Sequence, residues 1–152
     1  MVSRPQPSPD TALTIRRTIP ASRERVFRAW TDPSALREWS CPVGFTVAEA
    51  QVDLRVGGAY RIAMLPPDQS AARIAYGTYR EVRPPERLVY TWQWEGGEMG
   101  ETVVTVEFRD LGDQTEVVLM HELFPGADVR DLHAQGWASC LDHLQQALPR
   151  LA

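Results

Sequence analysis

The sequence predicts an α+β protein in which one curved antiparallel sheet of seven strands packs against a long C-terminal helix. Two observations predict this arrangement. Between residues 46 and 122, stretches of extended pattern are separated by turn-forming Gly, Pro and Asp residues. From about residue 128 onward, the apolar residues instead recur every three or four positions, which is typical of one face of a helix. The length of 152 residues suits a single domain with one core.

The first predicted elements are one strand and two short helices. Apolar and polar residues alternate over residues 11–19, which predicts a strand that Pro20 ends. Ser22 is the expected N-cap of the first helix. Asp32 is the expected N-cap of the second helix, which covers residues 34–39.

Six more strands and a long helix complete the chain. Short turns favour antiparallel neighbours, and the predicted strands cover residues 46–54, 59–65, 73–82, 87–94, 102–110 and 115–122. The helix begins near residues 128–131 and carries one apolar face, formed by Trp137, Cys140, Leu141, Leu144, Leu148 and Leu151. A single helix covers only part of a seven-stranded sheet, so this architecture leaves room for a ligand cavity.

Composition excludes several functions. The net charge is −4 and all 16 basic residues are Arg, so we expect neither a nucleic-acid partner nor lysine chemistry. Cys41 and Cys140 lie far apart in the chain and suggest a reduced, cytoplasmic protein. The sequence contains no apolar run long enough for a membrane span. Residues 1–10 are expected to form a flexible tail without the features of a signal peptide, and residues 11–152 a single domain.

Five stretches of the chain carry a family resemblance. They are RRTIPASRERVFRAWTDPSALREW (16–39), VDLRVGGAYRIAM (52–64), GTYREVRPPERLVYTWQW (77–94), ETVVTVEFRDLGDQTEVVLMHELF (101–124) and HAQGWASCLDHLQQAL (133–148). In this order and spacing, the chain resembles the START-like or Bet v 1-like (SRPBCC) superfamily, in the branch named after the activator of heat-shock-protein-90 ATPase. The resemblance implies a helix-grip fold with an apolar cavity between sheet and long helix. Relatives include lipid carriers, polyketide cyclases and co-chaperone domains, so it leaves the activity open.

The residues expected to line this cavity face inward from the strands and the helices. Aromatic side chains with polar tips suit a flat or amphipathic ligand, although the same rings also suit an ordinary core. The predicted ligand-binding residues are Trp39, Tyr60, Ile62, Met64, Tyr76, Tyr90, Trp92, Val104, Val106, Phe108, Leu119, His121, Phe124, His133, Trp137 and Leu141.

Two histidines and one glycine have alternative interpretations. His121 is either a polar anchor or proton carrier with a pKa near neutrality, or, as we favour, a residue at the wet end of its strand bonded to backbone. His133 lies either at the cavity mouth or, as we favour, against a loop. Gly136, inside the long helix, allows close approach either by a ligand or, as we favour, by a neighbouring element that packs against the helix. The spacing of His and Cys predicts no metal site.

The leading functional prediction is binding of a small hydrophobic or aromatic molecule, with no catalytic residue, metal or cofactor. One alternative is a cyclase or hydrolase that uses the same cavity, with one His or Glu as proton carrier. A second alternative is a co-chaperone or protein-interaction module that binds a chaperone. The sequence does not select a homodimer over a monomer.

Overall fold

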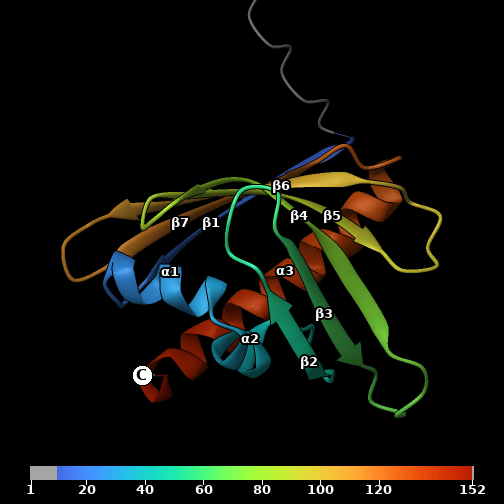
Figure 1. Ribbon diagram of the computed structural model, residues 1–152, viewed down its shortest axis with the longest axis horizontal. Helices are drawn as coiled ribbons and strands as arrows, with labels where there is room; N and C mark the ends of the chain where they lie inside the picture. The colour runs from blue at the N-terminus through green and yellow to red at the C-terminus, as the bar shows by residue number, and fades with distance from the viewer. Residues whose placement is uncertain (1–9, 152) are drawn as a thin grey trace, which may run out of the picture.

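The computed structural model describes residues 10–151, so the predicted tail of residues 1–10 lies outside the described residues except for Asp10. A seven-stranded antiparallel sheet curves around α3 (Ala127–Ala147), which runs along its concave side (Figure 1). The helices α1 (Arg23–Thr31) and α2 (Pro33–Trp39) lie together at one end of this helix, near the C-terminus. The predicted helix-grip architecture is confirmed.

The strands follow one another across the sheet in a simple order. From edge to edge the order is β1-β7-β6-β5-β4-β3-β2, and all neighbours are antiparallel. β2 ends two residues earlier than predicted. The remaining elements are β1 (Ala12–Ile19), β2 (Thr46–Val52), β3 (Ala59–Leu65), β4 (Arg73–Arg83), β5 (Arg87–Trp94), β6 (Thr102–Asp110), β7 (Thr115–Glu122) and the short 3-10 helix η1 (Leu148–Arg150).

The two short helices begin where the sequence predicts. The Ser22 hydroxyl accepts a hydrogen bond from the Arg25 amide (3.4 Å), and the Asp32 carboxylate accepts one from the Ser34 amide (2.9 Å). Each satisfies a backbone donor that the first helical turn leaves unpaired. None of the helices within residues 10–151 is both long enough and apolar enough to span a bilayer.

Gly77 of β4 allows a side chain of β3 to reach the backbone of β5. It lies opposite Tyr60 of β3, and a Cβ built on it would lie 2.0 Å from the Thr91 carbonyl oxygen of β5. The Tyr60 hydroxyl donates a hydrogen bond to this same carbonyl (2.5 Å). The missing side chain at Gly77 therefore lets the backbone of β5 approach closely, and the Tyr60 side chain reaches past Gly77 to this backbone.

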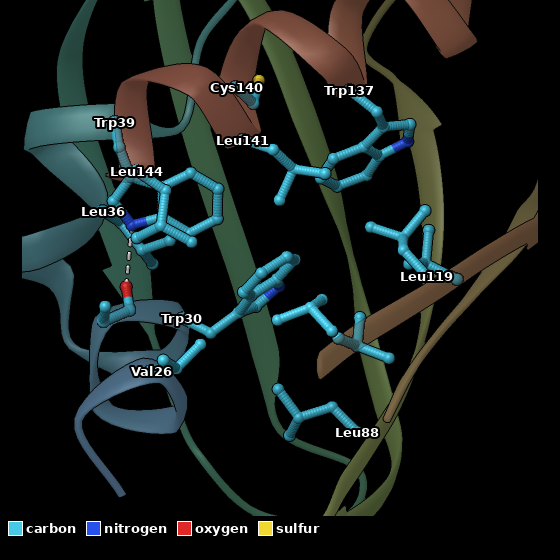
Figure 2. Close-up of a cluster of buried hydrophobic side chains, with 14 of the residues drawn as sticks. Val26, Trp30, Leu36, Trp39, Leu88, Leu119, Trp137, Cys140, Leu141 and Leu144 are labelled. Atoms are coloured by element: carbon cyan, nitrogen blue, oxygen red, sulfur yellow. Dashed lines mark hydrogen bonds between the residues drawn. The ribbon is translucent and has the colours of Figure 1, made fainter. Parts of the chain in front are cut away.

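The concave face is filled by side chains at the α1 end. Trp30 of α1 contacts Phe108 of β6 and Trp39 of α2 edge to face, with centroid distances of 5.7 and 4.7 Å. Trp39 Nε1 donates to the Ala29 carbonyl at 2.9 Å, the dashed line in Figure 2. Figure 2 shows Trp30 between the helices and Leu88 of the sheet. This end of the molecule is therefore a packed core.

Candidate functional site

A pocket of about 730 Å³ lies between the concave face of the sheet and α3. Its walls come from β3, β5 and α3, and its edges from the segments that follow α2 and β5. Val43 (72% exposed) and Leu132 (68% exposed) are part of the lining, so the pocket opens to solvent at these residues. Its volume falls within the range of small-molecule sites.

Half of the predicted ligand-binding residues line this pocket. β3 and β5 contribute inward-facing residues on alternate positions, and α3 contributes residues from its first half. The predicted residues in the lining are Trp39, Tyr60, Ile62, Met64, Tyr90, Trp92, His133 and Trp137.

The other predicted residues do not line the pocket. Tyr76 lies on the outer face of the sheet, opposite Arg61 and Gln93, because β4 turns Ala75, and not Tyr76, toward the core. The rest are buried in the core, where other side chains separate them from the pocket: Val104, Val106, Phe108, Leu119, His121, Phe124 and Leu141.

Several lining residues are absent from the prediction. Trp30 of α1 stacks near Trp137 of α3 (6.3 Å between centroids, 19° between planes) and forms the boundary between core and pocket. Tyr79 of β4 pairs with Tyr90 of β5 and lies 5% exposed. Helical spacing predicts that Trp30 faces inward, but it does not predict that its side chain extends to the sheet and lines the pocket. In β4, apolar residues occur on both faces, with Ala75 and Tyr79 on one and Ile74 and Tyr76 on the other, so alternation does not show which face is inward.

Gly136 lies in the pocket wall with open space beside it. A Cβ built on this glycine would meet no atom within 4 Å. The favoured interpretation, close packing against a neighbouring element, is therefore wrong. The glycine instead keeps this part of the helix surface free of side chain and leaves that space to the pocket.

The tyrosines of the concave face form one cluster. The rings of Tyr60, Tyr79 and Tyr90 lie within 6 Å of one another. Trp30 Nε1 donates to the Tyr90 hydroxyl oxygen at 3.2 Å. Burial raises the pKa of all three phenols, because the charged form would lose its hydration. Each hydroxyl therefore keeps its proton, and the Tyr60 hydroxyl donates its proton to the Thr91 carbonyl.

Trp92 is the only side chain in this lining with a buried nitrogen that lacks a partner among the described residues. It is 6% exposed, and its Nε1 makes no hydrogen bond. Its ring contacts Trp137 (5.3 Å) and Trp94 (5.5 Å). A buried indole N–H without an acceptor is uncommon in folded proteins and needs an explanation.

His121 is fully buried and does not line the pocket, but it contacts two residues that do, Trp92 and Trp137. Trp137 Nε1 donates to its Nδ1 (3.0 Å), and Thr102 Oγ1 lies 2.7 Å from its Nε2. Because the Thr102 hydroxyl donates to the Trp92 carbonyl (2.6 Å), it accepts from Nε2–H of His121. His121 is therefore neutral, and burial lowers its pKa well below the usual value. Both the favoured wet-end position and the alternative pKa near neutrality are wrong.

His133 lies in the pocket lining and is held in the neutral form in the same way. Trp94 Nε1 donates to its Nε2 (2.9 Å), and its Nδ1 lies 2.9 Å from the Val129 carbonyl, to which it donates. Burial lowers its pKa. Its ring also packs against Phe124, 4.9 Å away in the segment between β7 and α3, so the favoured loop contact is present together with the position in the pocket lining. Its ring lies 5.5 Å from that of His121, so two neutral imidazoles lie side by side at this end of the pocket.

Charged side chains in the lining are confined to its exposed edge. Arg73, Glu95 and Glu98 contribute to the lining, and all three are exposed. The Arg73 guanidinium lies over the Phe45 ring, 5.7 Å from its centroid. Among residues 10–151, no group of three His, Cys, Asp or Glu side chains is placed to hold a metal ion.

A sheet wrapped around one long helix, with two short helices after the first strand and a pocket between the layers, defines a helix-grip protein. A family model described as "Activator of Hsp90 ATPase homolog 1-like protein" matches residues 20–149, so the chain belongs to the AHSA1 family. Family and fold together support a ligand-binding, polyketide-cyclase-like class of protein. No curated protein matches the sequence.

Solved structures resemble the chain over most of its length. A protein from Chromobacterium violaceum is 28% identical with a TM-score of 0.84, covering 91% of this chain and 96% of that one. The AHSA1 protein from Silicibacter pomeroyi is 24% identical with a TM-score of 0.80, covering 91% and 97%. CalU16 from Micromonospora echinospora is 26% identical with a TM-score of 0.69, covering 90% and 75%.

Proposed function

We propose that the protein binds a small, neutral, largely apolar or aromatic molecule in this pocket and performs no covalent chemistry on it. The observation that carries the proposal is a pocket of about 730 Å³ whose walls are mainly aromatic rings and apolar side chains. Burial of apolar ligand surface supplies about 25 cal/mol per Å². Flat rings such as Trp92 and Trp137 offer stacking surfaces to an aromatic ligand.

Binding is favoured over catalysis because the inner wall offers no ready proton carrier. The cyclase or hydrolase alternative needs an ionisable group within hydrogen-bond reach of the substrate. In the lining, His133 already uses both ring nitrogens, and the carboxylates of Glu95 and Glu98 are on the exposed edge. The chaperone partner, the homodimer and the cytoplasmic location stay predictions.

Gly136 offers a direct test, because a side chain added there enters open space in the pocket wall. Gly136→Leu should occupy part of the pocket, whereas Gly136→Ala adds only one methyl group and serves as the matched control. The neutral fluorescent probe N-phenyl-1-naphthylamine is titrated into each protein. We expect wild type and Gly136→Ala to bind it, and Gly136→Leu to bind about tenfold more weakly.

Circular dichroism must show the same fold for all three proteins. Equal affinity of the three proteins for the probe would place binding elsewhere and contradict the proposal. Absence of any fluorescence increase with wild type would also contradict it.

A further inference from the structure

We infer that the pocket recognises an uncharged oxygen acceptor on its ligand, of the ketone or quinone carbonyl class, through hydrogen bonds donated by Trp92 Nε1 and the Tyr90 hydroxyl. The inference rests on the proposed function, since it names the ligand chemistry of the same pocket. It follows from two donors in the lining that have no acceptor among the described residues.

Trp92 supplies the first donor. Its Nε1 is buried and makes no hydrogen bond within the described residues. The neighbouring imidazole of His121, 5.9 Å away between centroids, cannot accept from it, because Nδ1 takes the Trp137 proton and Nε2 carries its own proton. A donor in such surroundings loses its hydration without compensation, and a ligand acceptor would restore the missing bond.

Tyr90 supplies the second donor. Its hydroxyl oxygen accepts from Trp30 Nε1, and indole nitrogen can only donate, so the direction of this bond is fixed. The proton of the Tyr90 hydroxyl has no acceptor among the bonds of the described residues. Tyr90 and Trp92 are two positions apart on β5 and share its inner face, so both side chains line the same stretch of the pocket.

Two acceptors of the inner wall, in contrast, are already occupied. His133 Nε2 accepts from Trp94, and the Tyr90 oxygen accepts from Trp30. At these two groups a ligand donor would meet an occupied acceptor, whereas a ligand carbonyl oxygen could accept from the unpaired protons of Trp92 and Tyr90.

The acceptor should carry no charge. An ionised carboxylate would lose its hydration inside the pocket, and a buried anion needs a cationic partner. The basic side chain of the lining, Arg73, lies at the exposed edge over Phe45, and His133 is neutral. The inner wall therefore favours a neutral dipole over an anion.

The test compares two flat molecules of nearly equal size, 9-fluorenone and fluorene, which differ in the carbonyl group. Tryptophan fluorescence quenching measures both affinities. We expect wild type to bind fluorenone about fivefold to tenfold more tightly than fluorene, as one or two neutral hydrogen bonds provide. Trp92→Phe and Tyr90→Phe should each reduce this preference. Ile62→Val, a lining variant without polar change, should leave the preference intact.

The infrared carbonyl stretch of bound fluorenone gives a second readout that packing alone would not move. It should lie at lower frequency in wild type than in Trp92→Phe, because hydrogen bonding weakens the C=O bond. If Trp92→Phe does not fold by circular dichroism, Tyr90→Phe tests the same preference. Equal affinity of wild type for the two molecules overturns the inference while the proposed function stands. If neither molecule nor N-phenyl-1-naphthylamine binds, the proposed function itself fails.

Discussion

Hydrogen-bond direction sets the protonation of both buried histidines. An indole N–H can only donate, so the nitrogen of His121 that faces Trp137 and the nitrogen of His133 that faces Trp94 must be unprotonated. Adding a proton to either ring would bring two N–H groups against each other. Each imidazole therefore contributes to packing and polar satisfaction in its neutral form, and neither is placed to serve as a proton carrier.

The first prediction concerns acid stability. The folded-state pKa of His121 lies below its unfolded value of about 6.5. The unfolded chain therefore binds the proton first, so the stability is fully present above about pH 6.5 and falls as pH decreases toward the folded pKa. The free energy of unfolding should decrease by about 1.4 kcal/mol per pH unit for each such histidine. Urea unfolding between about pH 7.5 and 5.5 measures the slope.

The variant His121→Gln provides the control for this prediction. Glutamine can accept from Trp137 and donate to Thr102 without titrating. The pH dependence of the free energy of unfolding should therefore lose the contribution of one proton, about 1.4 kcal/mol per pH unit. An unchanged slope in this variant would show that His121 is not the group responsible.

Tyr76 and Tyr79 show that the sequence alone does not determine which single residue of a strand faces the pocket. Both are aromatic residues of β4, and the alternation of this strand does not distinguish its two faces. The structure turns Tyr79 inward against Tyr90 and leaves Tyr76 on the outer face. Which face of β4 is inward is set by its pairing with β5, where Tyr79 lies opposite Tyr90 and Tyr76 opposite Gln93, and this is a property of two strands and not of one.

At the scale of the elements, charged side chains on the outer face of the sheet explain why apolar side chains pack on the concave face only. Arg87 of β5 lies between Glu81 of β4 (3.0 Å) and Glu107 of β6 (2.7 Å), and Arg109 of β6 continues to Glu116 of β7 (3.6 Å). Such half-exposed pairs contribute little each. Their cross-strand arrangement keeps this face hydrated and directs apolar packing to the concave side.

The second prediction compares two glycines in different elements. Gly77→Ala would place a Cβ 2.0 Å from the Thr91 carbonyl oxygen and should destabilise the fold by about 3 kcal/mol. Gly136→Ala meets no atom and should stabilise α3 by about 1 kcal/mol. Thermal unfolding of the two variants and wild type measures the difference. Similar unfolding temperatures for both variants would contradict the close approach of β4 and β5.

The sequence predicts elements better than it predicts the pocket. Caps at Ser22 and Asp32, and turns between alternating segments, are local signals, and the helices and strands begin near the expected residues. The division of inward-facing residues into core and pocket depends on where α1 meets α3. Phe108 and Tyr90 both face inward on neighbouring strands, yet only Tyr90 borders the pocket. No periodicity encodes that difference.

At the scale of the whole molecule, the concave face of the sheet has two parts, a packed core at one end and a pocket at the other. The two short helices fill the end where α1 packs on β6, and the pocket lies under α3 with Trp30, Leu36 and Trp39 at its border. Trp30 and Trp137, stacked between these regions, mark the boundary (Figure 2). The packed end therefore closes the core, and the pocket occupies the space beside it.

This division leads to the last prediction. The pocket is built from β3, β5 and α3, which come together only in the folded chain, so a pocket ligand binds the folded state and stabilises it. N-phenyl-1-naphthylamine at about one hundred times its dissociation constant should add about 2.7 kcal/mol. For a domain of this size, that raises the unfolding temperature by about 5–10 °C. Gly136→Leu, which binds the probe about tenfold more weakly, should show only about half of this shift at the same probe concentration, whereas Gly136→Ala should respond as wild type does. Native mass spectrometry should show the bound probe on wild type and its loss on denaturation. A probe that shifts the unfolding temperature of Gly136→Leu as much as that of wild type would place the binding site outside the pocket.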